Sequence, residues 1–149
     1  MKLDRLTVKA QDAIAQSRDV AIGLHHAEIT PEHVLVALLD QEGGVVPRIL
    51  TKLGADPRVV RADLDQSLAK LPKAHGAALD VQPSRAFKDL WEFAGKQAEA
   101  MKDEYVSTEH FLIALADGKS AASHALASAG ATPSAILEAL VSVRGNQRV

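Results

Sequence analysis

The side chains best suited to chemistry come as two Glu-His pairs, Glu32-His33 and Glu109-His110, in a sequence of 149 residues with six histidines and no cysteine. Neutral imidazoles can share a zinc or nickel ion when they converge from one helix face or hairpin. Neither His33 nor His110 has a histidine or an aspartate four residues further on. The spacing therefore favours capping or solvated histidines over a metal site.

Glu32 and Glu109 allow two interpretations. An acid in the first turn of a helix is stabilised by the positive end of the helix dipole, by about 0.3 to 1 kcal/mol, and needs no ligand. Alternatively, two such carboxylates beside a groove would hold amide or cationic groups of a bound peptide. The spacing alone favours the dipole interpretation and leaves the other open.

Catalytic motifs are missing from the sequence. The nearest approach to a phosphate-binding loop is Gly118-Lys119-Ser120, which lacks the upstream glycine and a preceding strand. We expect it to be a turn between helices. No serine lies in a Gly-x-Ser-x-Gly elbow, and no cysteine could serve as a nucleophile. We therefore predict no enzymatic activity and no cofactor in this domain.

Composition narrows the classes of partner. The 17 Lys and Arg residues against 19 Asp and Glu residues leave no basic footprint for nucleic acid. The absence of cysteine suits a reducing compartment, so a cytoplasmic location is expected. The charged opening Met1–Arg5 does not resemble a signal peptide, and no apolar run approaches the roughly 18 residues of a membrane span. We expect neither export nor membrane binding.

The chain contains an internal duplication. Residues 30–40 recur as residues 107–117, a shift of 77, and residues 53–57 recur as 129–133, a shift of 76 after one deletion. Such a repeat cannot bury its apolar face alone, so the two copies should pack together about a pseudo-twofold axis with a groove at their junction. We predict one domain, 1–149, with repeat 1 at about 1–70, a linker at 71–83 and repeat 2 at 84–149.

Each repeat is predicted to hold four helices, because Ser, Thr or Asp residues that can cap a helix recur at matching places. No stretch alternates with a period of two, so the predicted fold class is all-α. The tail from Arg144 to Val149 is polar and is expected to be unstructured. The expected helices span residues 7–24, 31–40, 45–53 and 57–70, then 84–101, 108–117, 120–129 and 133–143, with caps at Thr7, Ser84, Thr30, Ser107, Asp56 and Thr132.

The differences between the repeats bear more on function. Phe93 lies off the core stripe of its helix, and its counterpart in repeat 1 is Gln16. It is a candidate for an apolar binding surface, although it could instead pack against the linker or the other repeat. Asp103 corresponds to His26, and an acid in a loop is usually solvated. The core stripe itself consists of Phe87, Leu90, Trp91, Ala94, Ala98 and Met101.

The duplicated Glu-His motif, the opening Met1–Thr7, the turn at 41–44, and the segments 70–72 and 80–84 together resemble the Clp repeat, the N-terminal domain of the Clp family of hexameric AAA+ unfoldases. The resemblance covers essentially the whole chain and is strongest to the bacterial disaggregase branch, the Hsp100 class. It implies two pseudo-symmetric four-helix repeats. It also implies that the domain captures unfolded or aggregated client proteins through an apolar groove, and that AAA+ modules of the same chain then thread the client, using ATP.

Positions carried over from the family are expected to contact the client. The resemblance places polar contacts on Thr7, Asp103 and Glu109, and apolar contacts on Trp91 and Phe93. Two further positions are secondary candidates, Glu32 and His110. At His110 the disaggregase branch commonly has leucine, so this part of the groove is expected to be more polar here than in that branch.

Two other functions remain open. In the protease-linked branch of the family, the two repeats recognise adaptor proteins or phosphorylated arginine, with Glu32 and Glu109 holding the guanidinium. A stand-alone enzyme or metal protein built on the histidines is the alternative from another class.

Overall fold

Helix caps determine where the elements begin. In the computed structural model, which describes residues 1–74 and 80–145, a short 3-10 helix at Leu3–Arg5 precedes eight α-helices. The side-chain oxygens of Thr7, Asp56, Ser84 and Thr132 accept hydrogen bonds from first-turn amides, which confirms these predicted caps. The helices are α1 (Val8–Gly23), α2 (Pro31–Asp40), α3 (Val45–Leu53), α4 (Pro57–Ala69), α5 (Arg85–Ala100), α6 (Thr108–Asp117), α7 (Ala121–Ser128) and α8 (Pro133–Arg144).

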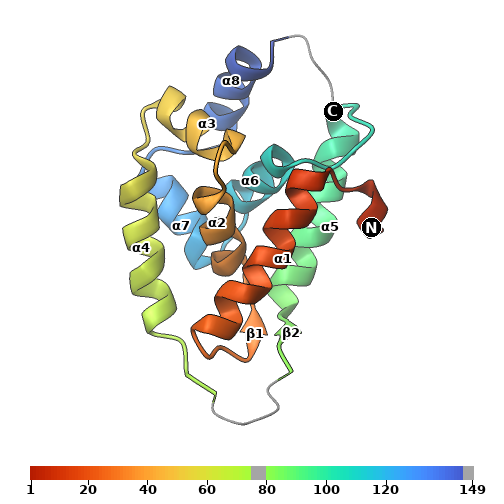
Figure 1. Ribbon diagram of the computed structural model, residues 1–149. Coiled ribbons are helices and arrows are strands. Elements are labelled where there is room, and N and C mark those ends of the chain that lie inside the picture. The colour runs from red at the N-terminus through yellow and green to blue at the C-terminus, as the bar shows by residue number, and fades with distance from the viewer. Residues whose placement is uncertain (75–79, 146–149) are drawn as a thin grey trace.

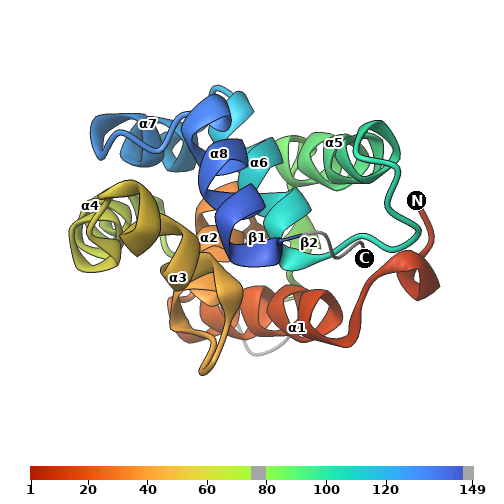
Figure 2. The same cartoon turned by 90° about the horizontal axis from the view of Figure 1, so that it is seen from above.

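The two sets of four helices pack as interlocked copies. Within each repeat the first two helices pair, α1 with α2 and α5 with α6 (Figure 1). The third helix of each repeat instead packs against the fourth helix of the other, so that α3 lies beside α8 and α7 beside α4 (Figure 2). The central helices α2 and α6 are buried along most of their length. This arrangement confirms an all-α fold built from a pseudo-twofold duplication.

Two very short parallel strand pairings were not predicted. β1 (Glu28–Ile29) pairs with β2 (Gln82–Pro83), and an isolated bridge joins Leu6 to Val106. Because Ile29 and Val106 are 77 positions apart, as are Leu6 and Pro83, the two pairings are copies of each other. Two residues are too few to show a period of two, so the pattern could not reveal them.

The ends of the repeats differ from expectation at one place. Arg144 is the last residue of α8 rather than the start of an unstructured tail, and Gly145 caps the helix with a positive φ of 61°. Most of the expected loop at 71–83 is non-helical, but residues 75–79 and 146–149 lie outside the described residues.

No single helix among the described residues is long and apolar enough to cross a membrane. The pair α7 and α8 passes that test by length and composition only when taken together, across a 70° bend.

Candidate functional site

Phe93 lines an apolar pocket at the junction of the repeats. The pocket, called here the Phe93 pocket, has a volume of about 390 Å³. It lies between α5, the α6–α7 connection and the first residue of α2. Its lining consists of Pro31, Ala86, Asp89, Leu90, Phe93, Ala114, Leu115, Gly118, Lys119, Ser120 and Ser123.

A second pocket, called here the Thr7 pocket, is the pseudo-symmetric counterpart of the first. It lies between the start of α1, the α2–α3 turn and the start of α6, and its volume is about 420 Å³. The lining is more polar because Thr7, Lys9, Gln41 and Glu109 face it. Its residues are Thr7, Val8, Lys9, Gln41, Gly43, Gly44, Val45, Ser107, Thr108 and Glu109.

The aromatic side chains of α5 point in different directions. Phe93 is 40% exposed at the Phe93 pocket, which confirms that it lies off the core stripe. Trp91 is partly buried against the core, where it stacks on Phe87 and tilts against Phe111. Its indole Nε1 donates to the Met1 carbonyl at 2.9 Å. Trp91 and Phe93 therefore do not share a pocket.

Glu32 stands in the first turn of α2, as predicted, but its carboxylate serves another helix. Its Oε2 accepts a hydrogen bond from the Ala122 amide at 3.0 Å, so this acid caps α7 of the other repeat. The positive ends of the dipoles of both α2 and α7 therefore stabilise the Glu32 carboxylate. This contact joins the two repeats beside the Phe93 pocket.

His110 sits in a fully buried chain of polar groups. Its Nδ1 accepts from the Ser107 amide at 2.8 Å, so the ring hydrogen is on Nε2, which donates to Asp103 Oδ2 at 2.7 Å. Burial lowers the pKa of His110, and the nearby carboxylates of Asp103 and Glu109 offset this only in part. The predicted capping role of His110 is confirmed, and the alternative of a solvated histidine is wrong.

The equivalent chain in repeat 1 contains two histidines. His33 Nδ1 accepts from the Thr30 amide at 2.9 Å, and its Nε2 therefore donates to His26 Nδ1 at 2.8 Å. Burial and the neighbouring His26 lower the pKa of His33 to about 4. Burial also lowers the pKa of His26, with Lys73 adding to the effect. Both rings are thus neutral near pH 7.

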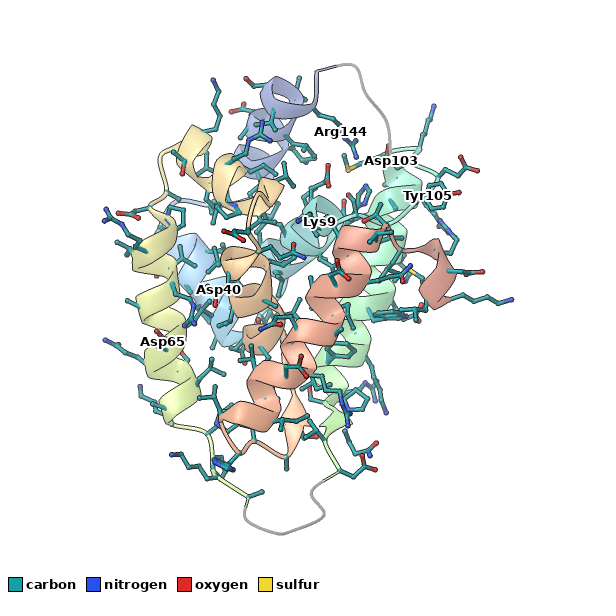
Figure 3. The ribbon with its side chains drawn as sticks, viewed as in Figure 1. Lys9, Asp40, Asp65, Asp103, Tyr105 and Arg144 are labelled. Atoms are coloured by element: carbon teal, nitrogen blue, oxygen red, sulfur yellow. The ribbon has the colours of Figure 1, made fainter. Side chains whose placement is uncertain are left out.

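Asp103 is not a solvated loop acid, and this expectation is wrong. Its side chain is fully buried, and Arg144 Nη2 approaches its Oδ2 to 2.8 Å in addition to the His110 contact. Figure 3 shows Arg144 and Asp103 next to each other at the end of α8. Arg144 Nη2 also lies 3.5 Å from Glu109 Oε2. Asp103 therefore acts within the domain, and Glu109 joins this buried cluster to the Thr7 pocket.

The predicted site residues thus fall into separate places. Thr7 and Glu109 line one pocket, Phe93 lines its counterpart, and Trp91, Asp103 and His110 lie inside the domain. Among the described residues, no three His, Cys, Asp or Glu side chains are grouped so that they could hold a metal ion.

Arg144 belongs to the buried cluster with Asp103 and Glu109 but was not predicted from the sequence. Its counterpart in repeat 1 is Leu68, at a shift of 76, and this replacement of an apolar residue by a cation is a signal of the same kind as Gln16 and Phe93. The expectation of an unstructured tail from residue 144 concealed it.

Comparison with known proteins agrees with this architecture. The family described as the Clp repeat (R) N-terminal domain matches residues 5–140, and the chain belongs to this family. Its relatives include the chaperone protein ClpB of Vibrio cholerae serotype O1, to which it is 39% identical over 149 residues. That alignment covers all of this chain but only 17% of the relative, so the chain corresponds to the N-terminal domain of ClpB-type, Hsp100-family chaperones.

Solved structures share the fold. The Hsp104 N-terminal domain from Candida albicans superimposes with a TM-score of 0.83 at 21% identity, covering 96% of this chain and 93% of that one. A structure described as a peptide from the EAEC T6SS Sci1 SciI protein gives a TM-score of 0.74 at 25% identity, covering 98% and 92% of the two chains.

Proposed function

We propose that this domain captures unfolded or aggregated client proteins for a ClpB-type disaggregase, with the Phe93 pocket as the main apolar contact. The observation that carries the proposal is a half-exposed aromatic ring over an apolar pocket at the repeat junction. Homology to ClpB chaperones suggests the class of partner. The related structure that is described as a peptide from the SciI protein supports peptide binding in this fold. ATP-driven threading by AAA+ modules in a hexamer and a cytoplasmic location belong to the same proposal.

The mode of binding follows from the two pockets. Apolar segments of a client dock against Phe93 and the neighbouring side chains of Leu90 and Leu115, while Thr7 and Glu109 meet polar groups in the second pocket. Because a flexible client loses conformational entropy when it is ordered, such contacts should be weak and broad in specificity. Weak binding also suits a domain that must release its client to the pore.

The alternative is recognition of adaptor proteins or phosphorylated arginine through Glu32 and Glu109. Both carboxylates already have partners within the domain, the Ala122 amide and Arg144, which favours client capture. A phosphoarginine titration separates the two functions, since the alternative requires saturable binding at both repeats.

The test is a titration of a permanently unfolded model protein into the isotope-labelled domain, followed by amide chemical shifts. Phe93→Ala should weaken binding about tenfold, because it removes a buried aromatic contact. Tyr105→Ala is the matched control, since Tyr105 is also an exposed aromatic residue, 46% accessible, but does not line the pocket. Equal affinities for both variants and the unmodified domain would reject the Phe93 pocket as the client site.

A further inference from the structure

The two pseudo-equivalent acids at the repeat junction have different partners. Glu32 accepts a hydrogen bond from the Ala122 amide at the start of α7. The counterpart of α7 is α3, which begins after Gly44 and has no side-chain cap. Glu109 lines the same pocket as Gly44 and Val45, but its carboxylate is paired with Arg144 instead. Glu109 therefore does not cap α3, although the pseudo-twofold symmetry with Glu32 and α7 would predict that it does.

Arg144 accounts for the difference. Its side chain is only 12% exposed, whereas Leu68 occupies the equivalent place in repeat 1 and brings no charge. A buried guanidinium needs acidic partners, and Asp103 and Glu109 supply them. Among the described residues, Nε and Nη2 of Arg144 meet no acceptor in hydrogen-bond geometry. Arg144 Nη2 lies 2.8 Å from Asp103 Oδ2 but 3.5 Å from Glu109 Oε2, so its contact with Glu109 is the weaker of the two.

We propose that Arg144 takes the place at the Glu109 carboxylate that a basic side chain of a client would otherwise take. Arg144 thereby sets which client segments the Thr7 pocket accepts. Its guanidinium neutralises the Glu109 carboxylate, so an arginine or lysine side chain of a client must displace it to bind there. The Thr7 pocket then discriminates against basic client segments, while apolar segments still enter the Phe93 pocket. The inference rests on the proposed capture of clients, because it concerns which client segments the same domain accepts.

The decisive variant transplants the neutral chain of repeat 1 into repeat 2. Asp103→His together with Arg144→Leu recreates the arrangement of His26 and Leu68 and leaves Glu109 without its internal partner. Arg144→Leu alone would remove the guanidinium from the buried Asp103 carboxylate and leave neutral His110 beside it, which would destabilise the domain. Circular dichroism and thermal melting establish that the double variant is folded.

The binding probes are an arginine-rich peptide and a matched peptide with glutamine in place of each arginine. The double variant should bind the arginine-rich peptide about tenfold more tightly than the unmodified domain, as one new charge-assisted contact implies. Added salt should reduce this gain, and Glu109→Gln in the double variant should abolish it. An unchanged affinity, or a gain that survives Glu109→Gln, would overturn the proposal.

A second measurement uses the unmodified domain and does not depend on any variant folding. Arg144 Nε is buried, so its hydrogen should exchange slowly in arginine side-chain NMR spectra. Saturating arginine-rich peptide should accelerate that exchange, and the glutamine peptide should not. Binding of the basic peptide at Glu109 without any change at Arg144 would contradict displacement. If Phe93→Ala does not weaken client binding, client capture at the Phe93 pocket is rejected. The affinity of the double variant for the arginine-rich peptide and the exchange at Arg144 Nε still test the role of Arg144 independently.

Discussion

The two repeats build the same buried polar chain with different chemistry. In repeat 1 the chain runs from the Thr30 amide through His33 to His26, and every member is neutral. In repeat 2 it runs from the Ser107 amide through a histidine to an aspartate, where an arginine closes it. One backbone arrangement therefore accommodates either a neutral network or an ionised one in which a guanidinium lies beside a carboxylate.

This difference shows which of the two pockets is connected to buried charges. The neutral chain adds no ion to the Phe93 pocket, where the charged lining residues are Asp89 and Lys119 and the nearby acid Glu32 serves as a helix cap. The ionised chain reaches Glu109 at the Thr7 pocket through Arg144. The repeats thus share their structure and diverge in the electrostatics of the two pockets.

The largest expected effect comes from breaking the ionised chain. Asp103→Ala leaves buried Arg144 with Glu109, at 3.5 Å, as its one acidic partner among the described residues, and loss of one member of a buried ion pair costs about 3 to 5 kcal/mol. The matched change in repeat 1, His26→Ala, removes a neutral partner and should cost about 1 to 3 kcal/mol. Urea unfolding measures both. Equal losses would show that the ionised chain is no more sensitive than the neutral one.

Acid should break the neutral chain next. The pKa of His33 is about 4 in the folded domain against 6.5 for an ordinary histidine, so the unfolded chain takes up a proton first. The resulting stability is fully present above pH 6.5 and is lost as the pH falls toward 4, by on the order of 3 kcal/mol. The pKa of His110 is also lowered, but its neighbouring carboxylates oppose the shift.

The pH dependence is checked by urea unfolding at a series of pH values between 4 and 7. His33→Gln should flatten the fall in stability more than His110→Gln, because the second histidine lies beside acids. A steeper contribution from His110 would reverse the comparison.

The fold was largely predictable because its signals are local. Caps such as Thr7, Ser84 and Thr132 fix helix starts from a few neighbouring residues, and the shift of 77 exposes the duplication. The site was less predictable because its contacts join distant positions. Nothing near Glu32 in sequence reveals that it caps Ala122, and the ionic partner of Asp103, Arg144, comes from the far end of the second repeat.

The junction acids provide a smaller test of the asymmetry. Glu32→Ala should weaken the start of α7 by about 1 kcal/mol, since it removes a capping acceptor and a favourable charge. Hydrogen exchange at the Ala122 amide should then quicken about fivefold. Glu109→Ala should leave exchange at Val46, the second residue of α3, unchanged, because Glu109 is paired with Arg144 rather than with α3. Faster exchange at Val46 would mean that both acids cap their partner helices.

The smallest effect separates folding from binding at Thr7. Thr7→Ala and Ser84→Ala each remove one capping oxygen, so each should lower the free energy of unfolding by roughly 0.5 to 1 kcal/mol. Thr7 also lines its pocket, whereas Ser84 lines neither pocket. With stability matched in this way, a client that contacts the Thr7 pocket should bind less tightly to Thr7→Ala alone, as isothermal titration would detect. If both variants lose affinity equally, Thr7 acts on binding only through the start of α1, and the polar contacts of the client lie elsewhere.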